Sequence, residues 1–449
     1  MLCCAVKMWY NKQKFETDGG GIAMTEGNVR TLCDGVDFQS IQNKAFKTTR
    51  ITVHFLLPLE QERAAANAVL TALLCRASRE YPTYTALSRR LEELYGASLN
   101  AQVRKQGDAQ LLSISAVGLA DRFALHGEAI SAELAALLCS VIFDPPFENG
   151  VFCKADFDQE VRQTCELIDA EFNDKKAYAK ERCIELMCRK EAYGLPRYGT
   201  KRQVQALTPQ ELTKAWEDLI AQARVRITAF GNCDPELVYN GFAKAFAKVK
   251  RKKTMNCGSM VIETAGDVQE INEPMEVAQS KLVMGFRTKI AAPQEQVYAE
   301  KLMTAMFGGT PHSKLFLNVR EKLSLCYYCA ARYNSHKGIL TVESGVETKN
   351  IDAAKAEILN QLEKMQAGDF TDEEIAFTKL SVCNQYRTVG DYLSSMDDWY
   401  TSQLLLPQSL TPEQAAEKIN RITREEIIYA AQQVTLDTVY RLVGAEEAE

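Results

Sequence analysis

The chain has 449 residues, an apolar fraction of 46% and a formal charge of −6 at pH 7. This length predicts about two to four domains, and the apolar fraction is sufficient for substantial cores. The negative net charge gives no reason to expect a nucleic-acid partner, because phosphate binding needs concentrated positive charge. The one basic run, residues 248–253, is interpreted as a solvated helix end.

Membrane insertion and export are not expected. The longest apolar stretches, 64–75 and 134–143, fall well short of the ~20 residues that a membrane-spanning helix needs. Residues 1–16 lack the basic start, long apolar core and small-residue cleavage site of an export signal. Fourteen cysteines in such a chain are expected to be reduced thiols, which indicates a cytoplasmic protein.

Cys326 and Cys329 are spaced like a redox or metal pair. Their surroundings, residues 325–332, predict a strand, and residues three apart on a regular strand point to opposite faces. We therefore expect both to be structural free thiols.

The first half of the chain predicts a mixed arrangement of strands and helices. Residues 1–26 are expected to be a disordered N-terminal extension in which Met24 is a candidate initiator. The elements that follow are a strand at 49–57, helices at 61–78 and 87–95, strands beginning at Ser98 and Gln110, and a helix at 121–140.

The second half repeats this order, which predicts an internal duplication. Its elements are a strand at 281–287, helices at 294–307 and 315–323, strands near Leu325 and Gly338, and a helix at 351–367. Near the end of each half, Thr208 with Glu211 and Thr423 with Glu426 have the spacing of a capping box. Each box precedes a strand that ends in glycine, at 225–231 and 439–444.

The duplication predicts an α+β fold of two homologous domains, each an antiparallel sheet covered by helices. We expect the first domain to span residues 27–247 and the second 274–449. The polar segment 248–273 is the expected linker.

Four short motifs in the second half carry a resemblance to a known family. They are Gly308-Gly309, Leu315-Phe316, Arg320-Glu321-Lys322 and Tyr327, seven residues after the arginine. The pattern resembles the C-terminal half of the M16 (insulinase, pitrilysin and processing-peptidase) zinc metallopeptidases. It looks closest to the noncatalytic YfmF-like branch, which is associated with 5-aminopentanol modification of elongation factor P.

The resemblance implies a zinc motif in the first half that this sequence lacks. M16 enzymes carry His-x-x-Glu-His on one helix and a Glu ligand on a later helix. The motif would fall on residues 61–78, which contain no histidine. The later helix, 156–168, carries Glu160 and Glu166, but the ligand position falls at Glu166 or Leu167, where a lone carboxylate is expected to be solvated. We expect no metal bound by this chain.

The resemblance also implies two substrate-contacting residues and a peptide-binding edge. In M16 enzymes an arginine and a tyrosine of the C-terminal half reach the scissile peptide, and here they match Arg320 and Tyr327. The residues that match the family's peptide-binding edge strand are Leu99, Asn100, Ala101, Gln102 and Val103.

Three hypotheses for function follow. In the first, the chain is the noncatalytic subunit of a heterodimer whose zinc-bearing M16 partner acts on a peptide or protein substrate. In the second, it is a peptide-binding or assembly scaffold with no proteolytic role. The third, a free-standing enzyme of another chemistry, finds no Ser-His-Asp, Cys-His or nucleotide motif in support.

Overall fold

The computed structural model describes residues 27–444. The predicted extension 1–26 lies outside the described residues, as does the stretch 445–449. The first half contains β1 (Asn28–Cys33), β2 (Val36–Gln42), β3 (Thr48–Pro58), α2 (Ala64–Leu73), α3 (Tyr84–Glu93), β4 (Ser98–Gln106), β5 (Ala109–Leu119), α4 (Ile130–Phe143), β6 (Phe147–Glu148), β7 (Val151–Phe152), α5 (Lys154–Asn173), α6 (Lys175–Met187), α7 (Lys201–Ala206), α8 (Pro209–Gln222), β8 (Arg224–Gly231) and α9 (Pro235–Phe246).

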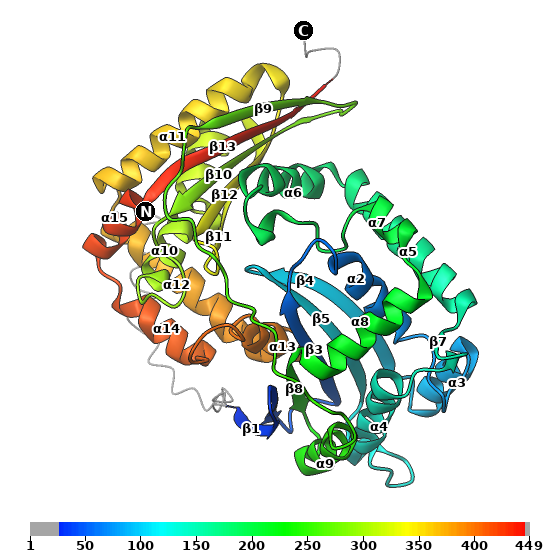
Figure 1. The fold of residues 1–449 in the computed structure, drawn as a ribbon. Helices are drawn as coiled ribbons and strands as arrows, with labels where there is room; N and C mark the ends of the chain where they lie inside the picture. The colour runs from blue at the N-terminus through cyan, green and yellow to red at the C-terminus, as the bar shows by residue number, and fades with distance from the viewer. Residues whose placement is uncertain (1–26, 445–449) are drawn as a thin grey trace, which may run out of the picture.

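The second half contains the same kinds of element in a closely similar order (Figure 1). They are β9 (Gln269–Pro274), β10 (Ser280–Thr288), α10 (Val297–Thr304), π-helical segments Ala305–Gly309 and Leu315–Lys322, β11 (Cys326–Asn334), β12 (Ile339–Val346), α11 (Ile351–Ala367), α12 (Asp372–Arg387), α13 (Leu393–Thr401), α14 (Pro412–Arg421), α15 (Arg424–Gln432) and β13 (Val434–Val443).

Each half is built on one sheet. The strand order is β1-β2-β8-β3-β5-β4 in the first half and β11-β12-β10-β13-β9 in the second. Neighbouring strands are antiparallel, except that β2 with β8 and β9 with β13 are parallel. Helices α2, α4, α8 and α9 cover the first core, and α10, α11, α12, α14 and α15 cover the second. None of the helices within residues 27–444 is long and apolar enough to cross a membrane.

The duplication extends to turns and helix caps. Both predicted capping boxes form, at Thr208 with Glu211 and at Thr423 with Glu426. The turn before β4 contains Gly96 with φ +74°, and the matching turn before β11 contains Ser324 with φ +50°. In each half, a residue with a left-handed backbone conformation thus lies in the turn that leads into the edge strand of the sheet.

The helix predicted at 121–140 begins later than expected. Residues 121–123 form a short 3₁₀ turn, and α4 starts at Ile130. The Asp121 carboxylate accepts hydrogen bonds from the backbone N–H of Ser131, at 2.7 Å, and from its hydroxyl, at 2.6 Å. Asp121 therefore caps the start of α4 instead of lying inside a helix.

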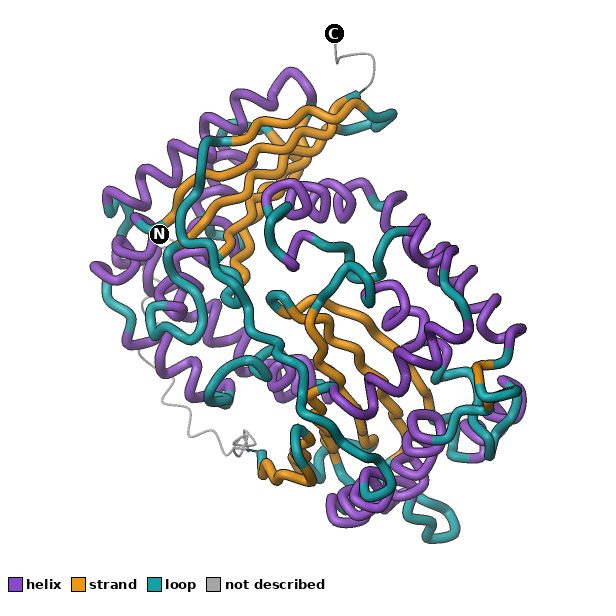
Figure 2. The backbone as a smooth tube through the Cα atoms, viewed as in Figure 1, coloured by secondary structure: helices purple, strands orange, loops and turns teal. Residues whose placement is uncertain are grey.

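Each half contributes a helix to the sheet of the other half. In the first half α6 packs on β10 and β13, where Cys183 contacts Val283. In the second half α13 packs on β3 and β8, where the Tyr400 ring lies 5.9 Å from the Phe230 ring. Figures 1 and 2 show α6 beside the second sheet and α13 beside the first. The exchange joins the two halves through apolar cores as well as through the linker.

The expected linker, 248–273, is partly structured. Between α9 and β9 the described chain has no helix or strand, yet it is held along the first half. The Met255 N–H donates to Gln222 O at 3.0 Å, and the Met260 N–H donates to the Asp108 carboxylate at 2.7 Å. Residues 269–273 belong to β9, which pairs with β13 in the second sheet.

Candidate functional site

The helix on which the zinc motif would fall is α2, and its buried polar side chains form hydrogen bonds inside the protein. Asn67 and Thr71 are buried and lie four residues apart, the spacing of the two imidazoles in an M16 zinc motif. The Asn67 amide donates to Gln110 Oε1 at 2.9 Å, and the Thr71 hydroxyl donates to the Asn67 carbonyl at 2.7 Å. This surface is a satisfied hydrogen-bond network without a strong metal ligand.

The expected third-ligand helix, α5, also lacks an available ligand pair. Glu166 is exposed, and Leu167 beside it is 50% exposed. Glu160 is buried and pairs with Arg76 at 2.8 Å. Burial raises the pKa of the Glu160 carboxyl even though the Arg76 guanidinium acts to lower it. Among residues 27–444, no three His, Cys, Asp or Glu side chains gather as a metal site would require.

Tyr327 lies at a β-bulge on the edge strand β11. Cys326 pairs with Val346 and Tyr328 with Gly345, so Tyr327 is the extra residue on its strand. The side chain of Tyr327 turns outward and is 62% exposed. Tyr328 turns the other way: its ring lies 4.3 Å from Lys176 Nζ on α6.

Arg320 belongs to the π-helical segment Leu315–Lys322, which ends just before β11. Its guanidinium lies 4.6 Å from the centre of the Phe316 ring, and its Nε lies 3.5 Å from the Glu321 carboxylate. π-Helical turns are rare and occur frequently at functional sites.

Arg320 and Tyr327 line the same cavity of ≈400 Å³. The other lining residues are Glu321, Ser324, Leu325, Cys326, Glu347 and Asn350. A second cavity of ≈760 Å³ also reaches Tyr327, with Glu276–Ser280 among its walls. Tyr327 therefore lines two cavities, and Arg320 lines one of them.

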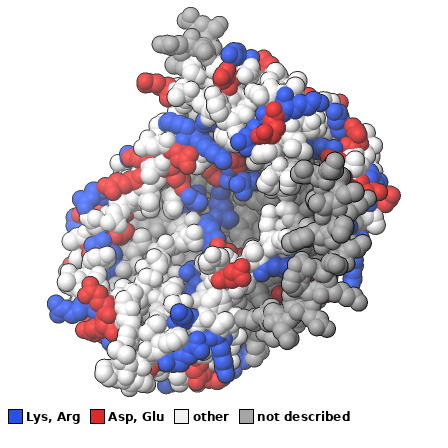
Figure 3. Space-filling view, turned by 180° about the vertical axis from the view of Figure 1, so that it is seen from behind, with Lys and Arg blue, Asp and Glu red and all other residues white. Residues whose placement is uncertain are grey.

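The predicted peptide-binding residues lie on the edge strand of the first sheet. Within the described chain, β4 pairs only with β5, so its other edge is unpaired. Asn100, Ala101 and Gln102 are exposed, and Leu99 is half-buried, whereas Val103 is buried. Farther along, Arg104 pairs with Asp398 at 2.6 Å. Figure 3 shows blue side chains gathered in the hollow between the halves.

Comparisons with known proteins identify the family. The model described as "Peptidase M16 inactive domain" matches residues 206–381. The chain is 30% identical over 414 residues to the "Probable inactive metalloprotease YmfF" of Bacillus subtilis (strain 168), covering 92% of this chain and 97% of that protein. The chain belongs to the M16 peptidase family. It is an inactive M16 homologue, as the missing imidazoles on α2 predict.

Solved structures share the M16 fold. A conserved protein from Enterococcus faecalis V583 matches with a TM-score of 0.86 and 28% identity, over 95% of this chain and 100% of that one. A protease from Helicobacter pylori matches with a TM-score of 0.77 and 13% identity, over 93% and 99%. The predicted α+β class with two M16-type domains is confirmed.

The M16 fold of this chain also assembles residues that the sequence analysis did not connect. His54 Nδ1 lies 2.8 Å from Ser113 Oγ, and His54 Nε2 lies 2.9 Å from Asp397 Oδ1. This is a Ser-His-Asp chain, which the sequence did not reveal because His54 and Asp397 are 343 residues apart. The Asp397 carboxylate also accepts hydrogen bonds from Arg50 and Thr228.

The Ser-His-Asp chain is structural. Ser113, His54 and Asp397 are 4%, 1% and 1% exposed, so no substrate carbonyl can reach the serine. Burial alone would raise the pKa of Asp397, but the His54 imidazole and the Arg50 guanidinium outweigh it and hold that pKa well below its ordinary value. The cluster fixes α13 on the first sheet.

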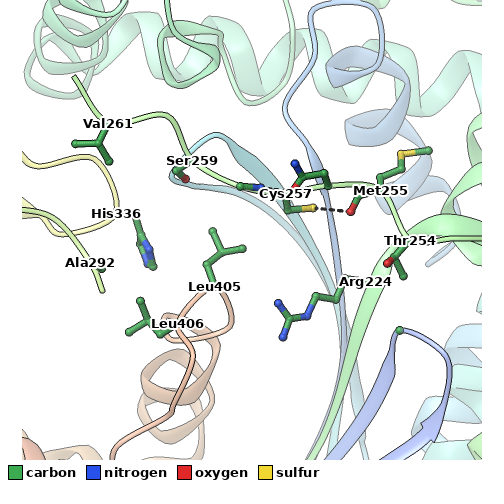
Figure 4. A pocket seen from close by; sticks show the side chains of 13 residues that line it. Arg224, Thr254, Met255, Cys257, Ser259, Val261, Ala292, His336, Leu405 and Leu406 are labelled. Carbon is green, nitrogen blue, oxygen red and sulfur yellow. Dashed lines mark hydrogen bonds between the residues drawn. The ribbon is translucent and has the colours of Figure 1, made fainter. Parts of the chain in front are cut away.

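A further cavity, of ≈600 Å³, lies along the linker and does not include Arg320 or Tyr327. Figure 4 shows the Arg224 side chain extending into it from the end of β8, opposite Leu405 and Leu406. His336 lines the same cavity and lies 2.9 Å from the Ser402 carbonyl through Nε2. The lining residues come from both halves, so the cavity follows their junction.

Proposed function

We propose that this chain is the noncatalytic subunit of a heteromeric M16 zinc metallopeptidase. In this proposal Arg320 and Tyr327 contact the substrate at a zinc site that the partner subunit supplies. The single observation that carries the proposal is that both residues line one cavity, with Tyr327 turned outward on an edge strand. The inactive M16 homologue thus retains an accessible arginine and phenol beside a first half that lacks zinc ligands.

The chemistry of the two side chains suits this role. A guanidinium offers several N–H donors in a rigid fork, which can hold a substrate carbonyl in a fixed orientation. A phenol O–H can donate to the oxyanion that develops when water attacks that carbonyl. Neither group needs a metal on its own chain. The partner's zinc would activate the water.

The substrate would be an extended peptide or protein segment. An unpaired strand edge can accept such a segment through backbone hydrogen bonds alone, which is β-augmentation. The exposed edge at Asn100, Ala101 and Gln102 on β4 is suited to this, and β11 is the matching edge of the second sheet. Peptide binding could therefore persist without metal in this chain. A cytoplasmic location and a link to elongation factor P modification belong to the same proposal.

The alternative is a peptide-binding or assembly scaffold with no proteolytic role. Arg320 argues for the catalytic role, because its guanidinium has only the adjacent Glu321 as an ionic partner within the described residues. A purely structural arginine at this place would be expected to pair across elements, as Arg287 does with Glu191 at 2.7 Å.

The test is co-expression with a zinc-bearing M16 homologue, followed by size-exclusion chromatography, metal analysis and a peptide-cleavage assay. We expect the two chains to elute as one complex and zinc to be found only in fractions that contain the partner subunit. Peptide cleavage should require both chains. Separate elution at micromolar concentration would reject the heterodimer. A stable complex without cleavage by any tested peptide would favour the scaffold.

A further inference from the structure

Two thiols lie side by side beneath the cavity that holds Arg320 and Tyr327. The bulge at Tyr327 shifts the alternation of β11 by one residue, so Cys326 and Cys329 share a face. This corrects the expectation that they point to opposite faces. Both are free thiols, 8% and 5% exposed, and both belong to the second core. Their side chains hydrogen-bond to each other.

Cys326 differs from its neighbour because it borders the cavity. It is one of the residues that line the ≈400 Å³ space, together with Arg320 and Tyr327. Of the two thiols only Cys326 belongs to the lining of this cavity, so we expect a reagent in the cavity to meet Cys326 before Cys329. The Arg320 guanidinium favours a negative charge on Cys326, and the Cys329 thiol donates to it. An electropositive, partly accessible setting is what distinguishes reactive cysteines from inert core cysteines.

Two other cysteines that line cavities provide a comparison. Cys188 borders a cavity of ≈260 Å³, and Cys257 borders the linker cavity. Burial raises the pKa of Cys188 to about 12 and that of Cys257 to about 11. The hydrogen bond from Cys329 outweighs burial at Cys326 and lowers its pKa to about 7. Three cavity-lining thiols thus differ in their expected thiolate content.

We propose that Cys326 is a modification site, at which electrophiles and peroxides entering the cavity react with its sulfur, and that the resulting adduct blocks access to Arg320 and Tyr327. With an alkyl halide, an S–C bond forms and halide leaves. With a hydroperoxide, the thiolate attacks one oxygen, an S–O bond forms as the O–O bond breaks, and the released alkoxide or hydroxide takes up a proton. The sulfur is oxidised to a sulfenic acid and the peroxide is reduced. The blocking step rests on the proposed function, whereas the modification does not.

The first test labels the folded full-length chain with iodoacetamide between pH 5.5 and 9 and quantifies each cysteine by peptide mass spectrometry. At pH 7 we expect Cys326 to react at least ~10-fold faster than Cys188 or Cys257, because only the thiolate is nucleophilic. In Cys329→Ala the midpoint of the Cys326 labelling profile should move to higher pH, since the hydrogen-bond donor is gone. Equal rates at the three cysteines, or an unmoved midpoint in a folded Cys329→Ala chain, would overturn the proposal.

The second test treats the heteromeric complex with iodoacetamide until Cys326 is fully labelled, and compares cleavage with an untreated sample. The same treatment of a Cys326→Ser complex controls for labelling elsewhere. We expect turnover to fall only where Cys326 is present. Full labelling with unchanged turnover would overturn the blocking step. Fast labelling of Cys326 in a complex that never cleaves would leave the modification site standing and reject the proposed function instead.

Discussion

Lys337 and Asp108 form a buried ion pair that joins the two halves of the chain. Lys337 Nζ lies 2.8 Å from Asp108 Oδ1, and the lysine side chain is fully buried. Lys337 is in the β11–β12 turn and Asp108 in the β4–β5 turn, so the pair connects matching turns of the duplicated domains. Glu191 extends the pair, because it lies 2.8 Å from Lys337 Nζ and 2.7 Å from Arg287 Nη2. Opposite charges thus meet at one point between the halves.

The first prediction concerns this ion pair. Lys337→Met should lower the free energy of unfolding by about 3–5 kcal/mol, because it leaves the Asp108 carboxylate buried without its cation and leaves Glu191 with Arg287 alone. Urea unfolding, followed by intrinsic fluorescence, measures the change. Lys154→Met is the matched control: Lys154 pairs with Asp158 at 2.8 Å, but its side chain is 77% exposed. Equal midpoints for the two variants would contradict a stabilising role for the buried pair.

The second prediction is a pH dependence that originates at Asp397. Its pKa in the folded chain is lowered, so the carboxylate stabilises the fold above the unfolded pKa, and this contribution is lost as the pH falls below about 4. Asp397→Asn should therefore be less stable than the parent at pH 7, and the difference should shrink with acidification. Thermal midpoints from pH 3 to 7 test this. Glu417→Gln is the control, because the Glu417 carboxylate is 69% exposed. Its thermal midpoint should change with pH in the same way as that of the parent. A difference in thermal midpoint between the parent and Asp397→Asn that stays constant with pH would show that Asp397 is not the source of the pH dependence.

The sequence was sufficient for features that depend on local pattern. The duplication could be inferred from capping boxes such as Thr423 with Glu426, because a cap needs only residues three apart. The absence of imidazoles on α2 could be inferred by counting back from residues 91–96, whose resemblance to the M16 family places the zinc motif within 61–78. In both examples the physical constraint acts within one element, so its signal is present in a short segment of sequence.

Features that depend on long-range packing were not predictable in this way. Asp397 meets His54 because α13 crosses to the other sheet, and no local pattern in α13 indicates that crossing. The pairing of Cys326 with Cys329 depends on a bulge, which inserts one residue into a strand of ordinary composition. On a regular strand, where side chains alternate between faces, these two thiols would point to opposite faces. The extra residue Tyr327 shifts the alternation, so they point to the same face.

The third prediction uses the two glycines that precede the Arg320 segment. A Cβ at Gly308 would lie 2.7 Å from the backbone N of Ala331 on β11, whereas a Cβ at Gly309 would meet nothing closer than 3.4 Å. Gly308→Ala should therefore destabilise the fold by about 1–3 kcal/mol, because the backbone of β11 must move. Gly309→Ala should have a much smaller effect. Thermal unfolding of both variants decides the matter, and similar losses would show that the close approach at Gly308 is not the cause.

The last prediction separates the catalytic role of this chain from the scaffold role. If Tyr327 donates to charge that develops on a substrate at the partner's zinc, Tyr327→Phe removes that interaction and keeps the ring. Loss of one such donor typically costs ~10²–10³ in rate, and Arg320→Ala should cost a similar factor. Tyr328→Phe is the matched control, because Tyr328 is adjacent in sequence but its ring turns toward Lys176 on α6.

Turnover, zinc content and complex formation are measured for all three variants and the parent. We expect Tyr327→Phe and Arg320→Ala to assemble normally and keep the partner's zinc while turnover falls, and Tyr328→Phe to retain most of the parental turnover. Parental rates in both Tyr327→Phe and Arg320→Ala, within a complex that cleaves peptide, would exclude a contribution to the transition state. A matching loss in Tyr328→Phe would point instead to general damage at the β11 bulge, since the two phenols face different surroundings and only Tyr327 borders the cavity shared with Arg320.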